Sequence, residues 1–154
     1  MDENTITKKE YKFMKQLTCG VIIINSDNKI LGCKAYGKGD IGQIYDIPKG
    51  KLEPNETPVQ TAIRETKEET GLNLNNIKLK DLGEFKYNSK KRLHLFKCKL
   101  DPNINDMYCK SRFDVNGVSR PEMVGYKFFN FNEISDNFYK NLGRVLNNIL
   151  NNEK

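Results

Sequence analysis

The sequence predicts an α/β/α sandwich, in which a β-sheet lies between a central helix and a helix at the C-terminal end. Three observations lead to this prediction. Several short runs of branched and aromatic residues have the length and composition of strands. Residues 57–71 have capping residues at both ends and an apolar stripe at helical spacing. Residues 132–150 repeat apolar residues at the same spacing.

The predicted strands are separated by turn residues, and the first contains the buried-strand pattern Val21-Ile22-Ile23-Ile24. They cover residues 16–25, 29–36, 44–47, 77–87, 92–100 and 126–131. Residues 102–117 show no clear periodicity, so we expect a loop there. The hairpin formed by 77–87 and 92–100 is basic, which suits either a solvated edge or contact with phosphate or RNA.

Residues 37–42 formally match the G-x-G-x-x-G pattern of dinucleotide-binding proteins. That fingerprint needs a helix to open at the glycines, whereas a short strand is predicted to follow here. We therefore expect residues 37–42 to form a flexible loop at the mouth of a substrate pocket rather than a dinucleotide site.

The central helix is delimited by local signals. Thr57 is a good N-cap, Pro58 suits the first helical position, and Gln60 can complete a capping box with Thr57. Gly71 is a natural residue just beyond the C-terminus.

Three acids, Glu65, Glu68 and Glu69, lie on this helix away from its apolar stripe, within an arc of about 100°. At i, i+3 and i+4 they repel one another, and the helix dipole disfavours anions near the C-terminus. A compensating cation would relieve both penalties, and clustered oxygen ligands suit Mg²⁺ or Mn²⁺. A solvated acidic face is the alternative.

Composition limits the possible classes of protein. A chain of 154 residues with 37% hydrophobic content predicts one domain over 1–154, with flexible ends at 1–11 and 148–154. No stretch resembles a signal peptide or a membrane span, so a cytoplasmic protein without membrane contact is expected. The net charge of +6 favours a polyanionic partner, although it also fits solubility alone. The oligomeric state cannot be inferred.

The four cysteines include no C-x-x-C pair, which argues against a zinc site and a redox motif. His94 is the only histidine, and one histidine cannot build a multi-histidine metal site. We expect it to be a sheet residue.

The glycine and charged residues around the helix also have a characteristic spacing. Five residues separate Gly50 from Glu56, and seven more lead to Arg64-Glu65. The remaining fixed positions are Glu68-Glu69 and Gly71-Leu72. This arrangement resembles the signature of the Nudix (MutT-like) hydrolases. Thr66 departs from it, because an aliphatic residue is usual there, but every charged position is present.

The resemblance implies the Nudix fold, an α/β/α sandwich with a mixed sheet around a catalytic helix, and a metal-dependent pyrophosphohydrolase. Glu65, Glu68, Glu69 and the Gly50 carbonyl would bind the metal, and Glu65 would also help to activate water. Arg64 and Glu56 would hold the loop and orient carboxylates. Many family members add a later acid. Glu122 is our candidate for both metal binding and catalysis, with Asp114 as second choice and a plain surface role as the alternative.

The substrate implied is a nucleoside diphosphate linked to another moiety. The segment Pro48-Lys49-Gly50-Lys51 resembles dinucleoside polyphosphate hydrolases and RNA-decapping members. A dinucleoside polyphosphate is therefore expected. The alternatives are the 5′ end of RNA, an (oxidised) nucleoside triphosphate, and a non-catalytic nucleotide-binding module. The candidate substrate contacts are Lys49, Tyr45, Lys34 and Tyr87.

Overall fold

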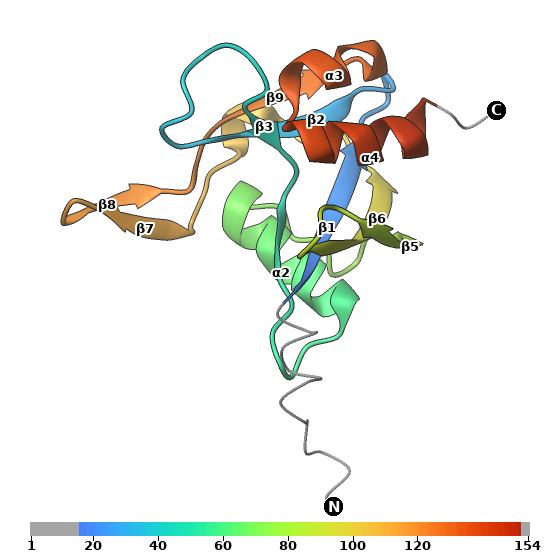
Figure 1. The fold of residues 1–154 in the computed structure, drawn as a ribbon, viewed down its shortest axis with the longest axis horizontal. Helices are drawn as coiled ribbons and strands as arrows, with labels where there is room; N and C mark the ends of the chain where they lie inside the picture. The colour runs from blue at the N-terminus through green and yellow to red at the C-terminus, as the bar shows by residue number, and fades with distance from the viewer. Residues whose placement is uncertain (1–15, 152–154) are drawn as a thin grey trace, which may run out of the picture.

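A computed structural model describes residues 16–151 (Figure 1). Its main feature is a seven-stranded mixed sheet with the order β3-β2-β1-β6-β5, in which β4 pairs with β1 and β9 pairs with β2. The strands are β1 (Leu17–Ile24), β2 (Ile30–Ala35), β3 (Tyr45–Asp46), β4 (Lys49–Lys51), β5 (Lys80–Lys86), β6 (Arg92–Lys99) and β9 (Met123–Phe129). The sandwich predicted from the sequence is confirmed.

β1 is the central strand, and all eight of its residues are buried. It runs parallel to β6, with Leu17 opposite Arg92 and Ile24 opposite Lys99. Because side chains alternate along a strand, β1 contributes to two cores. Val21 and Ile23 pack in the cluster that includes Ala62 of α2 (Pro58–Thr70), whereas Ile22 packs in the cluster that includes α4 (Lys140–Leu150). The two helices therefore cover opposite faces of the sheet (Figure 1).

The other edge of β1 is divided between two partners. β2 meets it only where Ile30 lies opposite Ile24, and β4 pairs with its first half. The chain crosses between these partners through residues 45–51, and the Val21 N–H donates to the Pro48 carbonyl at 3.1 Å. Gly20 makes this crossing possible, because a Cβ there would overlap Lys49 and the Pro48 carbonyl. The crossing brings Gly50 against α2.

α2 has the bounds and caps that the sequence predicts. Both bonds of the capping box between Thr57 and Gln60 are present, and Gly71 adopts the left-handed conformation with φ 78°. The atypical Thr66 is buried and satisfies its hydroxyl by donating to the Ala62 carbonyl at 2.8 Å. It therefore packs in place of an aliphatic residue without leaving a polar atom unpaired.

The C-terminal helix is interrupted, unlike the continuous helix predicted over 132–150. A 3₁₀ turn (Phe131–Glu133) leads into α3 (Ile134–Asn137), and α4 follows only after Phe138 has become extended. The interruption arises from a non-local bond, because the Tyr139 N–H donates to the Tyr45 carbonyl at 3.1 Å. Residues 148–150, expected to be flexible, form the end of α4. The other expected flexible positions, 1–11 and 152–154, lie outside the described residues.

The segment predicted as a loop, 102–117, contains structure. A 3₁₀ turn (Ile104–Asp106) is followed by β7 (Arg112–Val115), which pairs with β8 (Val118–Pro121) in a separate hairpin. This hairpin extends away from the sheet (Figure 1). Its turn has positive φ at Asn116 and Gly117, the conformation that Asn-Gly favours. β9 starts at Met123, three residues before the predicted 126.

Candidate active site

Arg64 links the carboxylates of the helix to the loop before it. Its Nε and Nη2 donate to the two Glu56 carboxylate oxygens at 2.8 and 3.0 Å. Its Nη1 donates to Glu65 at 2.9 Å and to Glu68 at 3.3 Å. Bidentate pairing with Arg64 lowers the pKa of Glu56, so this carboxylate stays charged and fixes the guanidinium. These contacts are compatible with the positioning role expected for Arg64 and Glu56, which stays a prediction.

Glu65 lies under the backbone of Gly50. Its carboxyl group fills the space that a side chain at residue 50 would occupy, so only glycine permits this approach. Burial, helped by the charges of Glu68 and Glu122, raises the pKa of Glu65 to about 7 against the opposing effect of Arg64. This carboxyl group can therefore exchange a proton near neutral pH.

Glu69 is the most enclosed acid of the helix and is only 2% exposed. It accepts the Lys49 N–H at 3.0 Å. Burial raises the pKa of Glu69 to about 9, and the nearby charges of Asp46 and Glu65 add to the effect. Lys49 only partly offsets this, because its ammonium donates to Asp46 at 2.9 Å. A buried carboxyl group with this little compensation is suited to a cation or a proton.

Asp46 is a site residue that sequence analysis missed. It is buried, binds Lys49 through one oxygen and accepts the Ile47 N–H at 2.8 Å through the other. No local pattern marks it, because its importance depends on how the crossing segment meets α2.

Residues 108–111 attach the β7–β8 hairpin to the C-terminal turn of α2. The N–H groups of Tyr108 and Lys110 donate to the carbonyls of Thr70 and Glu68, and the Tyr126 hydroxyl donates to the Glu69 carbonyl. These bonds satisfy carbonyls that a helix end leaves unpaired. The Glu122 N–H donates to the Ser111 carbonyl at 2.9 Å. The late acid is thereby placed beside the helix, as the prediction for Glu122 requires.

An open pocket of about 500 Å³, called the acid pocket below, contains Asp46, Glu69 and Glu122 in its lining. It is lined by Ala35, Tyr36, Lys38, Asp46, Lys49, Glu69, Phe113, Glu122 and Met123. Glu69 and Glu122 meet there, and the glycine-rich loop after β2 contributes Lys38. Glu68, the residue before Glu69 on the helix, is half-exposed. The second-choice acid Asp114 is exposed on β7.

The four candidate substrate contacts are placed differently. Lys49 lines the pocket, although its ammonium is paired with Asp46. Lys34 forms an ion pair with Asp40 and is not among the lining residues. Tyr45 packs edge-on against Phe129 with ring centroids 4.7 Å apart. Tyr87, like Tyr45, packs against the core beneath α4. The structure therefore brings only Lys49 of these four to the acid pocket.

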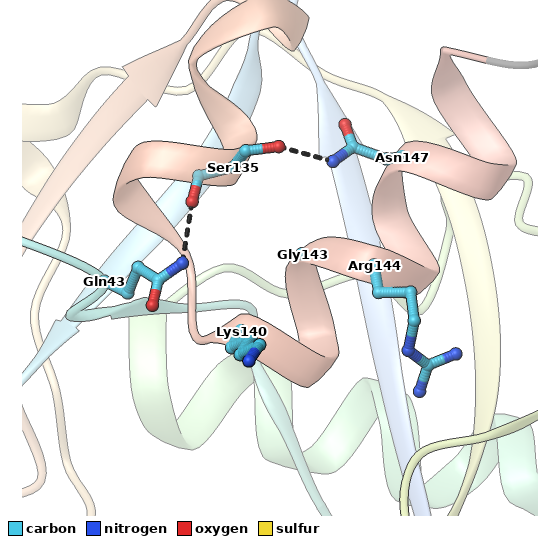
Figure 2. A pocket seen from close by; sticks show the side chains of 6 residues that line it. All are labelled: Gln43, Ser135, Lys140, Gly143, Arg144 and Asn147. Carbon is cyan, nitrogen blue, oxygen red and sulfur yellow. Dashed lines mark hydrogen bonds between the residues drawn. The ribbon is translucent and has the colours of Figure 1, made fainter.

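A second pocket, of about 210 Å³, lies between α3, α4 and the loop before β3 (Figure 2). Its polar groups are paired with one another: Gln43 donates to the Ser135 carbonyl and Asn147 donates to the Ser135 hydroxyl. Figure 2 shows Arg144 pointing away from Gln43, and its guanidinium donates to the Tyr87 carbonyl at 3.1 Å. The acid pocket is the better candidate, because it contains Glu69, a buried acid of α2 whose pKa is raised by burial.

Residues 14–149 match the family model described as the NUDIX domain. This chain belongs to the Nudix family. The uncharacterised 17.7 kDa protein in the e-segB intergenic region of Enterobacteria phage T4 is 34% identical over 146 residues, which cover 88% of this chain and 96% of that protein. The family prediction made from the helix and its flanking loop is thus confirmed, and with it a Nudix hydrolase at the level of the family.

Two further comparisons concern proteins that are named for an activity. An RNA pyrophosphohydrolase of Yersinia enterocolitica is 33% identical over 60 residues, covering 39% of this chain and 32% of that protein. The crystal structure of an Ap4A hydrolase binary complex from C. elegans superposes with a TM-score of 0.61 at 21% identity, covering 86% of this chain and 94% of that chain. The structural likeness to the Ap4A hydrolase supports the fold of this chain and nothing more.

The Nudix acids suit a divalent ion by their chemistry more than by their present arrangement. Among residues 16–151, no group of three His, Cys, Asp or Glu side chains converges as placed to hold a metal. Arg64 draws Glu65 and Glu68 toward itself, and Glu69 accepts a backbone N–H. Their carboxylate oxygens are nevertheless the hard oxygen donors that Mg²⁺ or Mn²⁺ prefers.

No helix within the described range is long and apolar enough to cross a membrane.

Proposed function

We propose that this Nudix domain is a Mg²⁺- or Mn²⁺-dependent pyrophosphohydrolase. It cleaves a phosphoanhydride bond in a nucleoside diphosphate linked to another moiety, with a dinucleoside polyphosphate as the first candidate. The observation that carries this proposal is the pair of enclosed carboxyl groups, Glu65 and Glu69. Their pKa values are raised to about 7 and about 9 beside a pocket of about 500 Å³.

Glu65, Glu68, Glu69, Glu122 and the Gly50 carbonyl are the proposed metal ligands. A divalent ion held there would supply positive charge against the negative charge that develops on the phosphates and would make a water molecule more acidic. Glu65 would help to activate the attacking water as a base, while the phosphoanhydride P–O bond breaks and its oxygen leaves with the departing phosphate. Arg64 orients Glu65 through the bond at 2.9 Å. Asp46 holds the Lys49 ammonium as a fixed positive charge at the pocket wall.

The comparisons support two substrate classes. The fold-level likeness to an Ap4A hydrolase favours a dinucleoside polyphosphate. The second candidate is the triphosphorylated 5′ end of RNA, favoured by the 60-residue match to an RNA pyrophosphohydrolase and by the net charge of +6. The complete set of acids argues against a non-catalytic binding module.

A substrate panel tests the proposal. The purified protein is incubated with dinucleoside polyphosphates, nucleoside triphosphates, nucleotide sugars and 5′-triphosphate RNA, each with Mg²⁺, Mn²⁺ or EDTA, and the products are identified. We expect cleavage with metal and none with EDTA. Glu68→Gln and Glu69→Gln should each lower kcat by about 10²-fold or more.

Glu53→Gln is the matched control, because Glu53 is exposed and its nearest Arg64 contact is long, at 3.9 Å. It should retain wild-type activity. A folded wild-type protein that releases no product from any substrate with either metal would refute the proposal. RNA as the preferred substrate would show a steep dependence of binding on salt.

A further inference from the structure

An aromatic pair forms one wall of the acid pocket. Tyr36, just after β2, and Phe113, on β7, meet edge-to-face with ring centroids 5.8 Å apart and planes inclined by 74°. Both side chains line the pocket. Phe113 is 40% exposed, although a large apolar side chain such as phenylalanine is usually buried. An apolar ring left open on a pocket wall indicates a ligand surface.

Positive charge accompanies this pair. The Arg120 guanidinium lies 5.8 Å from the centre of the Tyr36 ring, and Arg120 is the β8 partner of Phe113 in the hairpin register. Lys38 lines the same pocket. The lining also contains the acids Glu69 and Glu122, and the Tyr36 N–H donates to the Glu122 carbonyl at 2.9 Å. The pocket thus combines an aromatic, basic region with the acidic region where cleavage is proposed.

The volume of about 500 Å³ is within the range of small-molecule sites, which is roughly 300–1,000 Å³. A nucleotide has one aromatic base and a polyphosphate chain, so it matches both regions of this pocket. The lining residues include no Asn or Gln, the side chains that read base edges with paired donors and acceptors. Recognition by ring stacking does not depend on those edges.

We propose that Tyr36 and Phe113 bind the base of the substrate by stacking, with Arg120 and Lys38 beside its phosphates. The inference rests on the proposed function and specifies its substrate class: nucleotides held through the base of the nucleoside diphosphate, with little discrimination among bases. The β7–β8 hairpin is therefore a substrate-binding element of the active site.

Four hairpin variants test this role. Phe113→Ala removes the ring, Phe113→Leu keeps an apolar side chain but no ring, and Phe113→Tyr keeps an aromatic ring. Val118→Ala is the matched control, because Val118 is 48% exposed on the same hairpin and does not line the pocket. Circular dichroism and thermal melts verify folding. Calorimetry with Mg²⁺ and the non-hydrolysable α,β-methylene analogues of ADP and UDP gives Kd, and hydrolysis of the wild-type substrate gives KM and kcat.

We expect Phe113→Ala and Phe113→Leu to raise Kd and KM by about 10-fold, with kcat at saturation unchanged, while Phe113→Tyr and Val118→Ala behave like wild type. The two analogues should differ by less than about 10-fold in the wild type. If the wild type hydrolyses nucleotides but Phe113→Ala matches Val118→Ala, the inference is overturned and the proposed function stands. If the folded wild type neither binds nor cleaves any nucleotide, both are overturned.

Discussion

The carboxyl group of Glu65 occupies the space that a side chain at Gly50 would need. The overlap involves the end of a flexible side chain, so Gly50→Ala should move Glu65 rather than unfold the protein. We expect a loss of about 10²-fold in kcat with little change in melting temperature, because small misplacements of reacting groups are costly. Gly125→Ala is the control, since a Cβ there meets only Lys34 at 3.6 Å or beyond. Equal activity of the two variants would contradict the role given to this contact.

Replacement of Arg64 by lysine should distinguish the effect of its positive charge from the effect of the guanidinium shape. Lysine keeps the positive charge but cannot bind both oxygens of Glu56 and also reach Glu65 and Glu68. We expect Arg64→Lys to lower the free energy of unfolding by about 1–3 kcal/mol, measured by urea denaturation, and to lower kcat as well. Lys67→Arg, at an exposed position on the same helix, should change neither quantity. Wild-type kcat in Arg64→Lys would show that the guanidinium does not position the acids.

Without metal, the protein should lose stability as pH rises. The pKa of Glu69 is about 9 in the folded protein against an ordinary value of 4.5, so the folded state binds this proton more tightly. The resulting stabilisation is complete below pH 4.5 and is lost as pH rises through about 9. Glu65 adds a similar effect between 4.5 and about 7.

Urea unfolding in EDTA at pH 6 and pH 9 measures this loss. Glutamine resembles the protonated side chain of Glu69. Between pH 6 and pH 9, the free energy of unfolding should therefore fall by on the order of 1–3 kcal/mol less in Glu69→Gln than in the wild type. Mg²⁺ should stabilise the wild type most at pH 9, where it competes with fewer protons. Identical pH dependence in the two proteins would mean that Glu69 is charged in the metal-free state.

The Tyr126 hydroxyl donates to the Glu69 carbonyl at the end of α2. Tyr126→Phe removes the bond and leaves that carbonyl less well satisfied, so the free energy of unfolding should fall by about 1 kcal/mol. Since the Glu69 side chain is untouched, kcat should fall far less than in Glu69→Gln. Tyr108→Phe is the control, because Tyr108 is 51% exposed and pairs with Thr70 through its backbone. An equally large fall in the free energy of unfolding of Tyr108→Phe would mean that the loss comes from removing any tyrosine hydroxyl and not from this bond.

Local signals were sufficient to predict α2 and its acids. Thr57, Gln60 and Gly71 fix the helix by contacts within a few residues, so their pattern is visible in the sequence. Glu122 was predicted as a late acid, and the bonds of residues 108–111 to α2 explain how it reaches the pocket.

Non-local contacts account for what the sequence did not reveal. The break at Phe138 depends on Tyr45, far away in the chain, and Asp46 matters because the crossing segment brings Lys49 beside it. The β7–β8 hairpin was missed although Asn116-Gly117 is a strong turn signal, because the flanking strands are only four residues each. Phe113 was missed with it.

The attachment of residues 108–111 to α2 is made through main-chain atoms of the helix. Most side chains on the hairpin can therefore be exchanged without disturbing the turn that carries Glu68 and Glu69. With the hairpin binding the base as proposed, base binding and bond cleavage are carried by separable parts of the molecule. Hairpins of other sequence or length, grafted between residues 111 and 122, offer a direct way to change how tightly the base is held.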